Sequence, residues 1–484
     1  MEGKILQVRA ADLNGDRRSD LILVARTGLE PVFQRWIYVF AQTPDGAFTD
    51  QARTKHKVGD TVCAFDTADL AGNGSEQLLL LATDGLYAIE APCSTGGMIK
   101  ILDYRHALLF PDMSSLPYYD FVSDWKGDGS IWLMVPAFEE IRLVRLEDGK
   151  PAGEMEHVQT SIHYGMFASD GRGRGLSGMS IKSEATFPEL MLDEFDGDGN
   201  VDLFAAFGER MWVHRQDAQK RYSVEPDEKF LFQIKTEQEK VFRNSTARVA
   251  VYDLNGDRMA DTVVNKFGGS LSKMKSTTHV YMGRSGGGYA DAPEFSLDAE
   301  GFAGLIYFPD VDGDGKRDLV IPKAGIGVMD IIRALLTKTV SVQYEIYLFQ
   351  EESIYPEKPD FTRRVTYGVD YRAGITIFGF VPRFDGDFDG DGRLDMFLGT
   401  DRDQAQVYLG VEKSEGLFAS SPSAEVIVPA SLYFDLVDLS GDGLTDFFVY
   451  YPLEPSLEGE LRVFVNTGGW APVPKTAPKP EWNG

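Results

Sequence analysis

The chain has 484 residues, of which 43% are hydrophobic and 25% charged, so its composition is that of a globular protein with a sizeable core. Its 75 acidic residues against 48 basic ones give a formal net charge of −27, which disfavours nucleic acid and anionic lipid surfaces as partners. The sequence has no run of about 18 apolar residues and therefore predicts no membrane span. The many Gly, Pro, Phe and Tyr residues favour an all-β chain of short strands.

The first element in the chain with a recognisable pattern is an acidic loop that starts at Asp12. Its polar residues fall at alternate places, which we number as positions 1, 3, 5 and 9. The same frame recurs five more times along the chain. The six sets are Asp12, Asn14, Asp16 and Asp20; Glu194, Asp196, Asp198 and Asp202; Asp253, Asn255, Asp257 and Asp261; Asp310, Asp312, Asp314 and Asp318; Asp387, Asp389, Asp391 and Asp395; and Asp438, Ser440, Asp442 and Asp446.

Two degenerate copies fill the gaps between these six loops. One begins at Asp69 and has Ala71, Asn73 and Gln77 at positions 3, 5 and 9, and the other begins at Asp124 and has Lys126, Asp128 and Trp132 there. We number the eight loops 1 to 8 in chain order, so that the degenerate copies are loops 2 and 3. Their spacing indicates a repeat unit of about 55 to 60 residues with two insertions.

A second pattern supports the count of eight. Each loop is followed by an apolar strand, such as DLILVA at 20–25, and then by a strand of alternating character, such as RWIYVFAQ at 35–42. A strand that is apolar on both faces is typical of burial between neighbouring sheets. The pattern predicts an eight-bladed β-propeller of four-stranded antiparallel blades, and seven blades plus an irregular unit is the alternative.

Two insertions and a tail complete the organisation. The Gly- and Ser-rich segment 151–187 predicts a long loop. In segment 325–340 the apolar residues have helical spacing and predict a short amphipathic helix folded onto the propeller, or alternatively an element that docks a partner; these residues are Val328, Ile331, Ile332, Leu335 and Leu336. We expect residues 1–469 to form the propeller and the Pro-rich residues 470–484 to form a linker rather than a strand.

The acidic loops have the composition of Ca²⁺ sites. Ca²⁺ takes six to eight oxygen ligands, and acidic side chains that alternate with Gly can curl around one such ion. The residue at position 7 varies freely, as expected where only its backbone oxygen is used; these residues are Arg18, Asn200, Met259, Lys316, Arg393 and Leu444. An EF-hand is excluded because position 12 is apolar in all six loops, and the absence of a soft ligand set disfavours Zn²⁺. We expect about six structural Ca²⁺ ions, with the degenerate loops at Asp69 and Asp124 free of metal.

With their strand context, these loops resemble the FG-GAP and VCBS-type repeats, which also form the propeller of integrin alpha chains. The resemblance covers about residues 4–467. It implies that the loop residues are structural Ca²⁺ ligands, that partners bind elsewhere on the propeller, and that the protein lies outside the cytoplasm: periplasmic, secreted or at the cell surface.

The remaining residues carry little sign of chemistry. The six histidines show no metal-binding spacing, and Cys63 and Cys93 are too few for a disulfide framework, so a bridge and two free thiols both stay open. These observations favour a non-catalytic binding or assembly module whose protein or glycan partner contacts the inserted segments. One alternative is a carbohydrate-active enzyme similar to a polysaccharide lyase, with His157, His163, Arg172 and Arg174 as candidates. Another is a structural domain inside a larger secreted chain.

Overall fold

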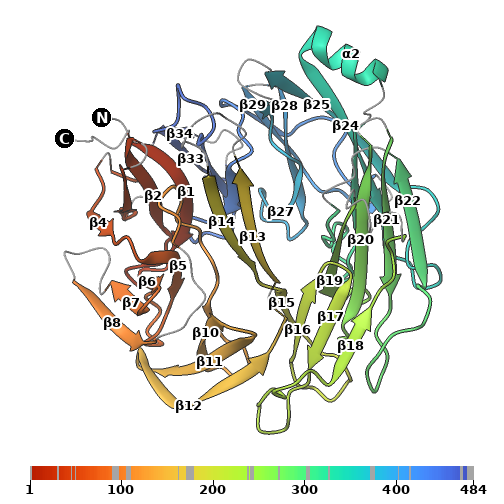
Figure 1. Ribbon diagram of the computed structural model, residues 1–484. Helices are drawn as coiled ribbons and strands as arrows, with labels where there is room; N and C mark the ends of the chain where they lie inside the picture. The colour runs from red at the N-terminus through yellow and green to blue at the C-terminus, as the bar shows by residue number, and fades with distance from the viewer. Residues whose placement is uncertain are drawn as a thin grey trace.

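The computed structural model describes residues 3–29, 32–44, 46–49, 51–89, 97–104, 111–161, 163–170, 179–236, 239, 245–270, 273–300, 306–324, 328–370, 376–401, 403–413, 416–468 and 473–476. Eight four-stranded antiparallel sheets are arranged around a common axis as an eight-bladed β-propeller (Figure 1). The predicted fold class is confirmed, and the seven-blade alternative is wrong.

Each blade is built from one continuous segment of the chain. In chain order the blades consist of β1 (Lys4–Ala11), β2 (Asp20–Leu29), β3 (Val32–Phe40) and β4 (Thr54–Val58); β5 (Val62–Ala68), β6 (Gln77–Ala82), β7 (Gly85–Ile89) and β8 (Met98–Asp103); β9 (Val122–Ser123), β10 (Ile131–Ala137), β11 (Glu140–Glu147) and β12 (Lys150–Gln159); β15 (Glu189–Asp193), β16 (Asp202–Phe207), β17 (Arg210–His214) and β18 (Glu228–Leu231); β19 (Ser245–Tyr252), β20 (Asp261–Ser270), β21 (Lys273–Tyr281) and β22 (Phe295–Glu300); β23 (Leu319–Ala324), β24 (Thr339–Tyr347), β25 (Phe361–Asp370) and β26 (Thr376–Phe378); β27 (Arg383–Gly386), β28 (Asp395–Asp401), β29 (Gln404–Tyr408) and β30 (Ala424–Ile427); and β31 (Phe434–Val437), β32 (Asp446–Tyr450), β33 (Leu461–Val465) and β34 (Val473–Thr476).

The apolar strand that follows each loop lies in the middle of the fold. In β28, for example, Met396, Phe397 and Leu398 are all fully buried. Met396 and Leu398 pack towards the sixth blade, whereas Phe397 packs towards the eighth. Burying such a side chain contributes about 1.5 to 3 kcal/mol, so both faces of this strand hold neighbouring blades together.

The sixth blade departs from the common plan. A single antiparallel bridge between Tyr307 and Val320 lies where the other blades have their first strand. Loop 6 follows this bridge, and β26 pairs with β25 as the fourth strand of the sheet. The loop therefore still joins the innermost segment of the blade to the buried strand β23.

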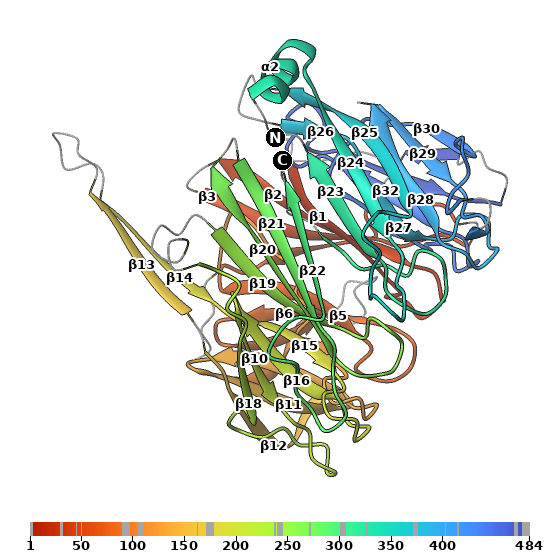
Figure 2. The same ribbon diagram turned by 90° about the vertical axis from the view of Figure 1, so that its right-hand side faces the viewer.

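The first insertion is not a long loop. Residues 150–159 form β12, and β13 (His163–Asp170) pairs with β14 (Met179–Thr186) in a separate two-stranded hairpin. The glycines that suggested a loop concentrate between the two strands, at 171–178, and leave flanks that can pair. Figure 2 shows this hairpin projecting away from the ring.

The second insertion contains the predicted helix, α2 (Val328–Thr337). The expectation that its apolar residues pack on the propeller is wrong for three of them, because Ile332, Leu335 and Leu336 are 43%, 56% and 79% exposed. Among the described residues, no helix is long and apolar enough to cross a membrane.

The C-terminal tail also differs from the prediction. Residues 473–476 form β34, which pairs with β33, and Pro474 lies opposite Phe464. A proline lacks the N–H that a central strand requires, but an edge strand such as β34 tolerates it. The last blade therefore extends past the expected boundary at residue 469. Cys63 is buried, whereas Cys93 lies outside the described residues.

The ring closes where the first blade meets the eighth. The Ile5 N–H donates to the Glu458 carbonyl at 2.8 Å, and the Ser19 N–H donates to the Leu439 carbonyl at 3.0 Å. Ile5 and Val8 also share a buried cluster with Phe448. Among the described strands none is exchanged between the two ends of the chain, because β1 and β34 lie in different sheets.

Gly441→Ala is expected to weaken this closure. A Cβ at Gly441 would lie 2.6 Å from the Arg17 carbonyl oxygen, and the residue has a φ of +76°. We expect a loss of unfolding free energy larger than about 2 kcal/mol, measured by denaturant unfolding in chelator so that metal affinity does not enter. Gly443→Ala is the matched control, since its φ is +85° but its Cβ would meet nothing; its loss should be only about 1 to 2 kcal/mol. Equal losses would contradict a tight contact at the closure.

A buried carboxylate joins the second and third blades. Asp66 on β5 is fully buried and accepts N–H bonds from Thr67, Phe121 and Val122 at 2.8 to 2.9 Å. Burial nevertheless raises the pKa of the Asp66 carboxyl group to about 6.

The raised pKa of Asp66 predicts a pH-dependent contribution to stability. The Asp66 carboxyl group binds a proton near pH 6 in the folded chain, but only near its normal pKa of about 3.9 in the unfolded chain. The loss of unfolding free energy caused by burying this group is therefore smallest at low pH, where it is neutral. Compared with Asp66→Asn, the wild type should lose about 2 kcal/mol of unfolding free energy between pH 4 and pH 7. Denaturant unfolding of both proteins across this range is the measurement, and a pH-independent difference would contradict it.

Candidate metal centre

The eight loops share one backbone conformation. In every loop the position-6 N–H donates to the position-1 carboxylate at 2.5 to 3.0 Å. The position-7 N–H donates to the position-5 side chain at 2.7 to 3.0 Å. The side chains at positions 1 and 5 therefore shape the hairpin before any ion is considered.

A second constraint on this shape is not evident from the acidic positions alone. Position 4 is a glycine with positive φ, as its residue type suggests, but position 6 is left-handed as well. Glycine occupies position 6 in six loops, and Arg17 and Arg258 adopt φ values of 66° and 65° in the other two. The recurrent second glycine was the signal, because it is the residue that adopts this conformation most readily.

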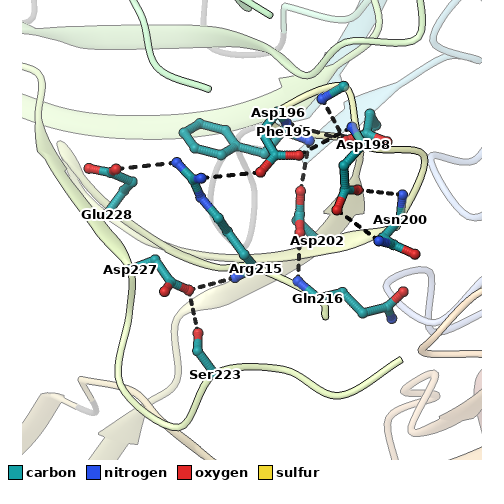
Figure 3. A network of polar contacts seen from close by, with 12 residues as sticks. Phe195, Asp196, Asp198, Asn200, Asp202, Arg215, Gln216, Ser223, Asp227 and Glu228 are labelled. Atoms are coloured by element: carbon teal, nitrogen blue, oxygen red, sulfur yellow. Dashed lines mark hydrogen bonds and ion pairs between the residues drawn. The ribbon is translucent and has the colours of Figure 1, made fainter. Parts of the chain in front are cut away.

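The position-9 aspartates anchor each loop to the blade. Asp20, Asp202, Asp261, Asp318, Asp395 and Asp446 are at most 1% exposed. In Figure 3, Asp202 accepts N–H bonds from Phe195 at position 2 and from Gln216 beyond β17, at 2.9 and 2.7 Å. The same two kinds of bond recur in loops 5, 6, 7 and 8.

Three loops bring acidic oxygens from positions 1, 3 and 9 together. The ligand atoms within each group lie within 4.8 Å of one another, and the groups are Glu194, Asp196 and Asp202; Asp310, Asp312 and Asp318; and Asp387, Asp389 and Asp395. The position-5 acids are not members of these groups. Loops 1, 5 and 8 have Asn14, Asn255 and Ser440 at position 3, so only an amide or hydroxyl oxygen is available there.

The electrostatics of the loops call for a cation. Burial raises the pKa of the carboxyl groups of Asp202, Asp261, Asp318 and Asp395 to about 7 and that of Asp446 to about 6, although each accepts backbone N–H bonds. The neighbouring acids of the same loops add to the rise. A divalent ion would remove this penalty, because it favours the charged form of each acid.

The donor set fits a hard ion. All side-chain donors in the loops are oxygens, which suits Ca²⁺ and does not suit soft metals. In loop 6, the buried Asp312 Oδ1 has no hydrogen-bond partner, as an oxygen reserved for an ion would. Two position-3 acids already face a side-chain cation, since Arg215 pairs with Asp196 at 3.2 Å (Figure 3) and Lys413 pairs with Asp312 at 3.3 Å.

Of the four candidate catalytic side chains, the structure describes only that of His157. His157 on β12 lies 3.1 Å from Glu140 and is about half exposed. The side chain of His163 and the residues Arg172 and Arg174 lie outside what the structure describes. The enzyme alternative would require these four side chains to converge on one pocket, and this stays untested.

The family comparison agrees with the geometry. Residues 387–449 match the family model of the FG-GAP-like repeat. The chain is an eight-bladed β-propeller that carries an FG-GAP-like repeat. The matched segment begins at position 1 of loop 7 and ends in β32, so it includes two acidic loops and the strands β28 to β31 between them.

Comparison with other proteins adds little to this. Among curated proteins, none matches the sequence. Among solved structures, an Agrocybe aegerita lectin that recognises non-reducing terminal N-acetylglucosamine has 12% identity and a TM-score of 0.27, covering 98% of this chain and 81% of its own. The V. cholerae biofilm matrix protein Bap1 has 12% identity and a TM-score of 0.28, covering 98% of this chain and 79% of its own. At these scores neither likeness carries an argument about this protein.

Proposed function

We propose that the protein is a Ca²⁺-stabilised, non-catalytic propeller that serves as a binding or assembly module outside the cytoplasm. The observation that carries the proposal is the buried position-9 aspartate, which recurs in six loops and meets two further acids in three of them. Such clusters destabilise a fold unless a cation neutralises them. About six Ca²⁺ ions held by positions 1, 3, 5 and 9 and by the position-7 carbonyls would supply that charge.

The partner surface is proposed to lie on the opposite face from the loops. Neighbouring strands of each blade are antiparallel, so the connection between the first and second strands lies at one end and the connection between the second and third strands at the other. The acidic loops are the connections between the first and second strands. α2 lies in the connection between β23 and β24, which are the second and third strands of the sixth blade. The β13–β14 hairpin follows a fourth strand and therefore lies at the same end of the propeller as α2.

The two insertions offer different contacts to a partner. α2 presents Ile332, Leu335 and Leu336 to solvent, which suits an apolar protein surface. The hairpin within 151–187 supplies a projecting strand pair (Figure 2). We propose that a protein or glycan binds through these segments, while the metal loops keep the blades in register.

Location outside the cytoplasm is supported by the chemistry of the loops. Carboxylate-rich loops of this kind suit Ca²⁺, and we propose that they belong to the weak affinity class of extracellular Ca²⁺ modules, which need a Ca²⁺-rich compartment. The FG-GAP-like repeat at 387–449 points the same way through its family resemblance.

The test measures binding on a glycan array and capture from the native envelope fraction, each with Ca²⁺ and with chelator. Replacing Ile332, Leu335 and Leu336 together by Gln should abolish partner binding without lowering Tm. Ile427→Gln is the matched control, because Ile427 is an apolar residue that is 82% exposed at the end of β30 and belongs to neither insertion. Binding that survives in the triple variant and in a variant without 162–187 would contradict the proposed surface.

A further inference from the structure

Loop 2 contains a side chain that makes the contacts expected of an ion site. The Leu70 N–H at position 2 donates to Gln77 Oε1 at 2.8 Å, as the position-2 N–H does to the position-9 aspartate in loops 4 to 8. Gln77 Nε2 in turn donates to the Ser75 carbonyl at 2.8 Å. Ser75 stands at position 7, whose carbonyl is the oxygen expected to bind the ion. One neutral amide therefore accepts the anchoring N–H and also satisfies the position-7 oxygen.

In loop 3 a lysine side chain supplies the positive charge that a bound ion would supply. Lys126 stands at position 3 and Trp132 at position 9, and the Lys126 Nζ lies 3.9 Å from the centre of the Trp132 ring. Lys126 also forms an ion pair with Glu156 of β12, and it is only 1% exposed. Positions 3 and 9 thus remain in contact, but the positive charge between them belongs to the chain.

We propose that Gln77 and Lys126 are internal substitutes for bound Ca²⁺, so that the second and third blades form an arc that keeps its structure without metal. The inference rests on the proposed Ca²⁺ binding of the other six loops. It adds that metal removal acts unevenly around the ring: loops 5 to 8 loosen, and the arc persists.

Hydrogen bonds from backbone and side-chain donors connect the arc to its neighbours. On one side the Glu76 N–H donates to the Asp12 carbonyl at 2.8 Å, and Ser75 Oγ donates to the Leu13 carbonyl at 3.0 Å. On the other side Gln216 Nε2 donates to the Lys126 carbonyl at 3.0 Å. Loops 1 and 4 each border the arc, and these hydrogen bonds stabilise them. Loops 5 to 8 have no contact with the arc itself among these bonds; they contact one another, loop 4 and, through loop 8, loop 1.

Hydrogen exchange measured by mass spectrometry tests the uneven response. The full chain is compared in saturating Ca²⁺ and after chelation. Peptides over 253–261, 310–318, 387–395 and 438–446 should lose protection at least about tenfold on chelation, whereas peptides over 69–77 and 124–132 should keep theirs. Equal loss in all loops would overturn the inference while leaving the proposed Ca²⁺ sites intact. No change anywhere, with no Ca²⁺ bound at equilibrium dialysis, would instead overturn the proposed function.

Two variants of loop 2 give an independent readout. Gln77→Ala should lower Tm by the same amount in Ca²⁺ and in chelator, because the amide acts without metal. Ala71→Asp combined with Gln77→Asp restores acids at positions 3 and 9, and should raise the Ca²⁺ bound per chain by one ion in equilibrium dialysis with elemental analysis. An unchanged stoichiometry in the folded double variant, or a Gln77→Ala effect seen only with Ca²⁺, would contradict the substitution.

Discussion

Chelation of Ca²⁺ is expected to lower the Tm of this protein by more than about 10 °C, and added Ca²⁺ should restore it. Each site occupied at 100 times its Kd contributes about 2.7 kcal/mol to the folded state, and six such sites would dominate the stability of the chain. The physical reason is the set of buried position-9 carboxyl groups in loops 4 to 8, whose pKa values burial raises to about 6 or 7 when no ion is present.

Thermal unfolding followed by circular dichroism in excess chelator and in a Ca²⁺ titration is the measurement. Mg²⁺ at matched concentrations is the control, because it requires near-octahedral geometry and dehydrates reluctantly, so it should restore much less of the Tm. A melting curve that is the same in chelator and in millimolar Ca²⁺ would contradict the proposal that Ca²⁺ stabilises this fold.

The architecture was predictable because its signals are local and repeated. Each loop and the buried strand after it lie within about 15 consecutive residues, so alternate acids and apolar runs can be counted directly from the sequence. The same locality explains why α2 was found, since its spacing is visible within ten residues.

The parts that escaped prediction depend on contacts between distant segments. β34 forms because a free edge of β33 is available to residues 473–476, which no local pattern reveals. The exposure of Leu336 depends on where the propeller ends rather than on the helix itself. Lys126 looked like the loss of a site, because its partner Glu156 lies 30 residues later on β12.

The position-9 aspartate is expected to stabilise the fold through its hydrogen bonds as well as through the bound ion. In loop 7, Asp395 accepts N–H bonds from Phe388 and Gly410 at 2.6 and 2.7 Å, whereas Asp389 at position 3 is exposed and accepts only a 3.2 Å bond from Asp391. Asp395→Ala leaves two N–H groups without their acceptor, so it should cost about 2 to 5 kcal/mol both in Ca²⁺ and in chelator.

Asp389→Ala is the matched variant that separates the two roles of a loop acid. It removes a carboxylate from the same cluster without removing an anchor, so it should lower stability in Ca²⁺ and leave it unchanged or slightly higher in chelator, where repulsion among the acids is relieved. Denaturant unfolding of both variants in both conditions is the measurement. If the two variants behave alike in chelator, position 9 acts only through the ion; if they differ as expected, the buried aspartate anchors the hairpin to its blade and the ion completes the site around it.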